Sequence, residues 1–213
     1  MIQTVTLHYL FDPLCGWCYG ASGTIGTLAK HPDVDLQPQA TGLFAGSGAR
    51  PMKSFAAQAW ANDQRIAALS GRKFSDAYRN KVLGAEDALL DSTVATLAVT
   101  AVADTAPERV LEALSAIQTA RYVDGKDVTS AAVVASLLEN LGLVDASARV
   151  LTPDAALAEQ VRDRTAKARD LMETYNMQGV PSLIAEVDGT RRGLDASTLY
   201  SGPDTVLAAL GLA

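Results

Sequence analysis

The only two cysteines of this 213-residue chain, Cys15 and Cys18, lie three positions apart. Two cysteines placed at random would have this spacing in about 1% of such chains, so the spacing itself calls for an explanation. A structural zinc site needs four ligands, and the two histidines, His8 and His31, do not have metal-ligand spacing, so no metal is expected. Disulfide exchange needs a thiolate and a second thiol that resolves the mixed disulfide. The pair is therefore predicted to be redox-active.

The residues on either side of the pair indicate where each thiol lies. The segment Thr4–Phe11 is rich in Val, Leu, Tyr and Phe, which predicts a buried strand, and Asp12-Pro13 forms a turn directly before Cys15. A helix is expected to follow, so Cys15 lies at its N-terminus, where unpaired N–H groups and the helix dipole favour a thiolate. Cys18 lies one turn later. Cys15 is therefore predicted to be the exposed, attacking thiol, and Cys18 the better buried, resolving thiol.

Alternative interpretations exist for these residues. Buried cysteines are common, and a lone Cys-x-x-Cys sequence has many false positives, so the pair could belong to the core near a helix start. Trp17 either shields the disulfide and offers its face to a thiol substrate, or is a plain surface aromatic. Asp12 and Tyr19 are close to the site in sequence, but a solvated turn and core packing explain these two residues equally well.

The elements that must position the pair predict an α/β protein. Further strands are expected within 33–44, 183–187 and 190–194. A hairpin turn is expected at Asp188-Gly189, and a closing helix over 203–210. From about 52 to about 150 the apolar period is helical, and one such series is Val110, Leu114, Ile117 and Arg121. We therefore expect one domain made of residues 1–45 and 150–213, and a helical insertion domain over 46–149.

The composition is that of a soluble globular protein, with 48% hydrophobic and 20% charged residues. The formal net charge of −6 leaves no basic footprint for nucleic acid or an anionic membrane, so neither is expected as a partner. The first seven residues lack the features of a secretory signal, and no later stretch is long enough to cross a bilayer. A cytoplasmic protein is expected, in a compartment where thiols are mostly reduced.

Three features together resemble the DsbA family of thioredoxin-fold proteins. They are Cys15-Gly16-Trp17-Cys18 at a strand-to-helix turn, Val180-Pro181 before a strand, and a helical insertion between them. Residues 11–20 and 117–123 look like the leaderless, cytosolic, glutathione-linked (DsbM-like) branch, which borders the kappa-class glutathione transferases and 2-hydroxychromene-2-carboxylate isomerases. The resemblance covers essentially the whole chain. It implies a thioredoxin-like fold with a large all-helical insertion, and a cis Val180-Pro181 bond that faces the thiols and pairs with substrate backbone.

The resemblance also implies where glutathione would bind. Gly193-Leu194-Asp195 corresponds to the segment with which the glutathione-using relatives hold the γ-glutamyl end. Asp195 would accept the ammonium group, and the N–H groups at the helix start beginning with Ala196 would hold the carboxylate. Those relatives usually have a basic residue where this chain has Ala196, and Asp195 could instead be only a helix cap. Trp17 and Val180 complete the expected contacts.

Two positions depart from the family pattern. Trp17 stands where the periplasmic oxidant of the family has a histidine that stabilises the thiolate, so a milder oxidant is expected. Tyr9 stands six residues before Cys15, where thioredoxin-like proteins often have a buried acid. Deprotonation of Cys18 is therefore expected to depend on water or on another group.

The sequence therefore predicts a thiol–disulfide oxidoreductase, of protein-disulfide reductase or isomerase type, with Cys15, Cys18 and Pro181 at its catalytic site. It would exchange disulfides with glutathione, with protein thiols or disulfides, or with both. One alternative is a kappa-class-like glutathione-dependent transferase or isomerase, in which Cys15 merely holds glutathione; the presence of Cys18 argues against it. Another is a non-enzymatic holdase or a module that binds a regulatory protein, but the chain has only 4 Met and no Met-rich apolar face to support it.

Overall fold

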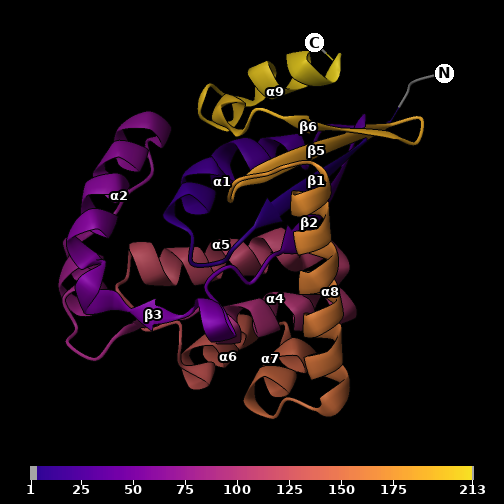
Figure 1. Cartoon of the computed structure of the whole chain (residues 1–213). Helices are drawn as coiled ribbons and strands as arrows, with labels where there is room; N and C mark the ends of the chain where they lie inside the picture. The colour runs from indigo at the N-terminus through magenta and orange to yellow at the C-terminus, as the bar shows by residue number, and fades with distance from the viewer. Residues whose placement is uncertain (1–3, 213) are drawn as a thin grey trace.

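The computed structural model describes residues 4–212, which contain a four-stranded mixed sheet (Figure 1). Its strands are β1 (Val5–Phe11), β2 (Val34–Ala40), β5 (Ser182–Val187) and β6 (Thr190–Leu194). Their spatial order is β2-β1-β5-β6; β2 is parallel to β1, β5 is antiparallel to β1, and β6 is antiparallel to β5. The two central strands carry the segments expected at the site, since β1 leads into Cys15 and β5 directly follows Pro181.

Helices cover both faces of this sheet. On one face, α1 (Gly16–Leu28) and α9 (Pro203–Leu210) share a core with Leu7, Tyr9 and Phe11 of β1 (Figure 1). On the other face, α8 (Ala155–Thr174) packs Ala168 against Leu10 and Ile184. Because successive strand residues point to opposite faces, Tyr9 points to the side on which α1 carries the second cysteine.

The chain between β2 and α8 forms the helical insertion. Its α-helices are α2 (Ala56–Ser70), α3 (Asp76–Tyr78), α4 (Thr93–Thr105), α5 (Val110–Tyr122), α6 (Ala131–Asn140) and α7 (Val144–Leu151). The insertion is not wholly helical, because β3 (Arg50–Pro51) and β4 (Leu89–Leu90) form a short antiparallel ladder. One apolar core includes residues of both the sheet and the insertion. The division into 1–45 with 150–213 and 46–149 therefore stays a prediction.

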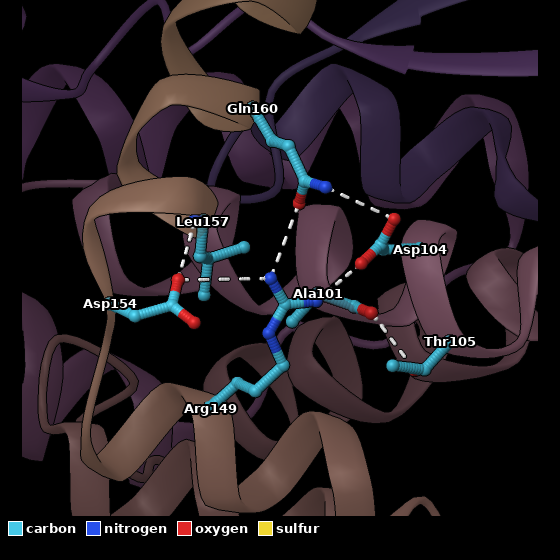
Figure 2. Close-up of polar contacts among 7 residues, drawn as sticks. All are labelled: Ala101, Asp104, Thr105, Arg149, Asp154, Leu157 and Gln160. Carbon is cyan, nitrogen blue, oxygen red and sulfur yellow. Dashed lines mark hydrogen bonds and ion pairs between the residues drawn. The ribbon is translucent and has the colours of Figure 1, made fainter.

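A polar cluster joins α4, α7 and α8 at the end of the insertion. Arg149 donates to Asp104 at 2.6 Å and to Gln160 at 3.3 Å, and Gln160 donates to Asp104 at 3.1 Å (Figure 2). Asp154 caps α8 by accepting a hydrogen bond from the Leu157 N–H at 2.7 Å. The hydrogen bond from Arg149 holds the pKa of Asp104 below its usual range.

The turn and helix-end signals of the sequence are confirmed. Asp188 and Gly189 have positive φ values of 49° and 76° and join β5 to β6, as a type I′ hairpin turn requires. The closing helix α9 begins at Pro203 and ends before Gly211, which has a left-handed φ of 77°. The helix after the cysteine pair begins at Gly16, so Cys15 itself is its N-cap.

Candidate active site

The structure brings the two predicted halves of the site together at Cys15. As the N-cap of α1, Cys15 accepts a hydrogen bond on Sγ from the Cys18 N–H, with a sulfur–nitrogen distance of 3.4 Å. Its thiol also donates to the Val180 carbonyl oxygen at 3.4 Å. The Val180–Pro181 peptide bond is cis, and both cysteines are free thiols. Residues 165 positions apart in sequence thus meet at one sulfur atom.

The burial of the two thiols corrects one expectation. Cys15 was predicted to be exposed, but only 6% of its surface is accessible, because Leu14, Trp17 and residues of the insertion surround it. Cys18 is fully buried. Burial raises the pKa of the Cys18 thiol well above its ordinary value, and the adjacent Cys15 raises it further. Cys15 is thus the more accessible thiol of the pair, within a pocket and not on an open surface.

Asp12 is a structural centre of the site that the sequence left unresolved. It is fully buried, which excludes the solvated turn. Its carboxylate accepts hydrogen bonds from the Leu14 N–H at 2.9 Å, the Phe44 N–H at 3.1 Å and the Ser92 hydroxyl at 2.7 Å. Burial raises the pKa of Asp12, although these three donors oppose that shift. Asp12 therefore holds the turn that delivers Cys15 and ties this turn to the insertion.

Trp17 borders an open pocket on the side of Pro181. Its ring meets Tyr200 edge-on, with 5.3 Å between ring centroids, and the Tyr200 hydroxyl donates to the Trp17 carbonyl oxygen at 2.8 Å. The pocket has a volume of about 460 Å³, and its lining residues are Trp17, Leu69, Pro181, Ala196, Ser197, Tyr200 and Ser201. The pocket therefore lies between Trp17, which separates the two cysteines in sequence, and the segment predicted to bind glutathione.

Asp195 has the role of a helix cap in this structure. Its carboxylate accepts a hydrogen bond from the Ser197 N–H at 2.9 Å, which begins the short 3₁₀ helix Ala196–Tyr200. This hydrogen bond holds the pKa of the exposed Asp195 below its usual range. Ala196 lines the pocket beside Trp17, whereas Asp195 does not. The cap does not test the predicted glutathione contact, which stays a prediction.

On the opposite side of Cys15, the insertion adds buried polar residues that the sequence did not single out. Asp63 of α2 is 4% exposed and accepts a hydrogen bond from the Tyr78 hydroxyl at 2.9 Å. Burial raises the pKa of Asp63 to about 6. Asp63 and Arg121 line a pocket of about 100 Å³ together with Cys15. In the sequence, Arg121 continues the apolar series of α5. This position in the series was the one sequence signal that could have predicted its burial.

Gly16 has a steric reason to stand between Cys15 and Trp17. A β-carbon added at this position would lie 2.6 Å from an oxygen of the Asp63 carboxylate and 3.3 Å from a methyl carbon of Ile66. Glycine therefore allows α2 to pack closely on the first turn of α1. Within residues 4–212, no group of three His, Cys, Asp or Glu side chains is placed to hold a metal ion.

Comparison with known families identifies the class. The sequence matches the DSBA-like thioredoxin domain over residues 6–200. Since the match spans most of the chain, the protein belongs to the DSBA-like thioredoxin family. The predicted fold class, a thioredoxin-like fold with a large helical insertion, is thereby confirmed.

Several solved structures are similar to this chain. The cytosolic disulfide reductase DsbM from Pseudomonas aeruginosa is 32% identical, with a TM-score of 0.86 and 97% of each chain covered. The same protein with GSH is 31% identical, with a TM-score of 0.83 and 97% of each chain covered. A 2-hydroxychromene-2-carboxylate isomerase is 18% identical over 97% of this chain and 94% of its own, with a TM-score of 0.64; this likeness shows the fold alone. No curated protein matches the sequence.

The predicted resemblance to the DsbM-like branch is confirmed by these structures. In the part of the chain that the structure describes, no helix is both long enough and apolar enough to cross a lipid bilayer.

Proposed function

We propose that this protein is a cytosolic thiol–disulfide oxidoreductase that uses glutathione as its thiol co-substrate and acts on protein disulfides. The observation that carries the proposal is the contact of Cys15 Sγ with the Val180 carbonyl oxygen at 3.4 Å, directly before the cis Pro181. This contact marks the place where a substrate backbone could pair with Val180 while its sulfur meets Cys15. The similarity to the cytosolic disulfide reductase DsbM supports the reductive direction and the compartment.

In the oxidative half of the exchange, the Cys15 thiolate attacks one sulfur of oxidised glutathione. A Cys15–glutathione disulfide forms, and the first glutathione leaves as a thiolate. Cys18 then loses its proton and attacks the Cys15 sulfur, so the Cys15–Cys18 disulfide forms and the second glutathione leaves. The reverse sequence uses two glutathione molecules to reduce the protein, which can then reduce a substrate disulfide.

The pocket beside Trp17 and Pro181 is our proposed glutathione site. Trp17 and Pro181, the neighbours of Cys15 and of its contact Val180, line this pocket, and so do Ala196 and Ser197 at the start of the 3₁₀ helix that Asp195 caps. The structure of DsbM with GSH, at 31% identity, supports a glutathione site in this class of protein. Trp17 would cover the peptide, and the Asp195 segment would bind its γ-glutamyl end.

The division of labour between the thiols tests the proposal. With Cys18→Ser the attacking thiol remains but the resolving thiol is lost, so a mixed disulfide should accumulate on exposure to oxidised glutathione. Intact mass should show one added glutathione, and peptide mapping should locate it on Cys15. The matched Cys15→Ser variant should gain much less, because Cys18 is fully buried.

Other outcomes contradict particular parts of the proposal. Capture of glutathione by Cys18 in the Cys15→Ser variant would reverse the assigned roles. Full turnover by Cys18→Ser would instead indicate a glutathione-dependent transferase or isomerase, which needs no resolving thiol. If neither substitution changed any activity, the oxidoreductase proposal would be wrong.

A further inference from the structure

Gln118 of α5 is a buried polar side chain without an evident structural role. Its residue surface is 0% exposed, and within residues 4–212 neither its amide nitrogen nor its amide oxygen has a hydrogen-bond partner. Leaving both ends of a buried amide unpaired is costly, and buried amides normally bond to protein or to ordered water. The position of Gln118 therefore indicates a polar neighbour that is not part of the protein.

A cavity beside Gln118 has room for that neighbour. Its volume is about 130 Å³, and its lining residues are Tyr9, Ser22, Ile25, Gly26, Arg72, Leu111, Leu114, Ser115 and Gln118. A buried water needs roughly 10–15 Å³ of such space and two to four polar partners, so several waters fit here. The cavity runs from the buried Tyr9 and Gln118 to the half-buried Arg72 and the exposed Ser115. It thus connects the interior with solvent.

Tyr9 links this cavity to the resolving cysteine, which does not itself line it. Tyr9 lines the cavity, and its hydroxyl donates to the Cys18 carbonyl oxygen at 3.4 Å. The two side chains also interact electrostatically. Burial raises the pKa of Tyr9 well above its ordinary value, and the charge of a Cys18 thiolate raises this pKa further. Ser22 lies four residues after Cys18 on the same helix, and it too lines the cavity.

Cys18 needs such an outlet for its proton. It is fully buried, and it must become a thiolate before it can attack a mixed disulfide on Cys15. No carboxylate lines the cavity, and Arg72 is the one charged residue among its lining residues. Asp12 and Asp63 do not line it either: Asp12 bonds to Leu14, Phe44 and Ser92, and Asp63 lies in the pocket on the Cys15 side.

We infer that Gln118 holds a chain of water molecules in this cavity that carries the Cys18 proton past Tyr9 to solvent during resolution. The inference rests on the proposed oxidoreductase function and adds a positioning residue to it. In this step the Cys18 S–H bond breaks and water accepts the proton. The Cys18 sulfur then bonds to Cys15, and the bound thiol leaves as a thiolate. In the reductive direction the same water returns a proton to Cys18.

The test separates the two chemical steps of one turnover. Reduced full-length protein is mixed with 2-hydroxyethyl disulfide, quenched in acid at a series of times, and analysed by intact mass for the mixed and the internal disulfide. In Gln118→Leu, formation of the mixed disulfide should stay within about twofold of wild type, because Cys15 does not face the cavity. Resolution should slow by about tenfold or more, which is less than the roughly 10²–10⁴-fold contributed by a side chain that transfers the proton itself, because Gln118 only positions the water. The pH profile of that step should also move to higher pH.

Two further variants keep the result interpretable. Gln118→Glu places a proton acceptor in the same cavity and should restore fast resolution. Thr96→Val is the matched control, because the buried Thr96 hydroxyl also has no hydrogen-bond partner among the described residues but does not line the cavity. Both steps should remain unchanged in this variant. Gln118→Leu removes an unpaired polar group, so thermal unfolding should show that it remains folded.

The outcomes also separate this inference from the proposed function. If wild type forms an internal disulfide rapidly and Gln118→Leu does so equally fast, the proton path is refuted and the oxidoreductase function stands. Equal slowing of both steps, or slowing by Thr96→Val as well, would show a general structural effect and also refute it. A wild-type protein that reacts with neither 2-hydroxyethyl disulfide nor oxidised glutathione would refute the proposed function itself.

Discussion

Replacing Asp63 with Asn should make the protein more stable at neutral pH and should leave it little changed in acid. Asp63 is 4% exposed, and its pKa is raised from 3.8 to about 6 by burial. Between these two values the folded protein binds a proton that the unfolded chain has released. The free energy of unfolding therefore falls as pH rises through this window. The contribution of Asp63 is fully present only below its pKa in the unfolded chain. Asn has the same shape and still accepts from Tyr78, but it carries no charge.

The magnitude follows from the size of the shift. A rise of about 2 pH units corresponds to roughly 3 kcal/mol of stability, since each unit is worth about 1.4 kcal/mol. Urea unfolding of the reduced wild type and Asp63→Asn should be measured between about pH 4 and pH 7.5. The stability difference in favour of the variant should grow by up to roughly 3 kcal/mol with rising pH, at no more than about 1.4 kcal/mol per pH unit.

Two controls assign the effect to the buried carboxyl group. Asp163→Asn neutralises an exposed aspartate on α8, and its stability difference should stay within about 0.5 kcal/mol across the pH range. Tyr78→Phe removes a hydrogen bond that lowers the pKa of Asp63, so the loss of stability should move to higher pH. A difference curve for Asp63→Asn that is flat, or that falls with rising pH, would refute the reasoning.

Two further predictions concern the redox pair and the turn before it. Because Trp17 stands where a histidine would stabilise the thiolate, the reduction potential of the Cys15–Cys18 couple should lie at about −200 to −230 mV. Equilibration with glutathione buffers measures this potential, and a value near about −120 mV would contradict the prediction. Asp12→Ala should lower the free energy of unfolding by about 3 kcal/mol, because three buried donors lose their acceptor. A urea titration showing a loss below about 1 kcal/mol would contradict the assigned role of Asp12.

The elements that could be predicted from the sequence are those with strong local signals. Asp188-Gly189 and the Pro203 and Gly211 ends of α9 depend on backbone conformations that only a few residue types favour. Helix α7 had no such signal at its ends: Val144 and Leu151 are 62% and 53% exposed, and the residues that it buries are Ala146, Ser147 and Val150. The β3–β4 ladder has two residues in each strand, so alternation could not reveal it.

The residues of the candidate site also fall into those that the sequence predicts and those that it does not. Cys15 and Cys18 could be found because their chemistry depends on their own spacing and on the strand-to-helix turn. Asp63 and Gln118 could not, because a polar residue in an amphipathic helix normally faces water, and only the packing of α2 and α5 against α1 buries these two. Arg121 was the partial exception, since it interrupted an apolar series.

Helix α5 carries two buried residues, Tyr122 and Gln118, that lie near the thiol pair. The Tyr122 hydroxyl donates to the carbonyl oxygen of Leu14, the residue before Cys15, at 2.7 Å. One turn earlier, Gln118 lines the cavity that Tyr9 links to Cys18. Because residues four apart lie on one face of a helix, a single face of α5 reaches the surroundings of both sulfur atoms. The insertion thus reaches the surroundings of the thiol pair, and we expect substitutions in α5 to change exchange rates, although this helix lies about 100 residues from the cysteines.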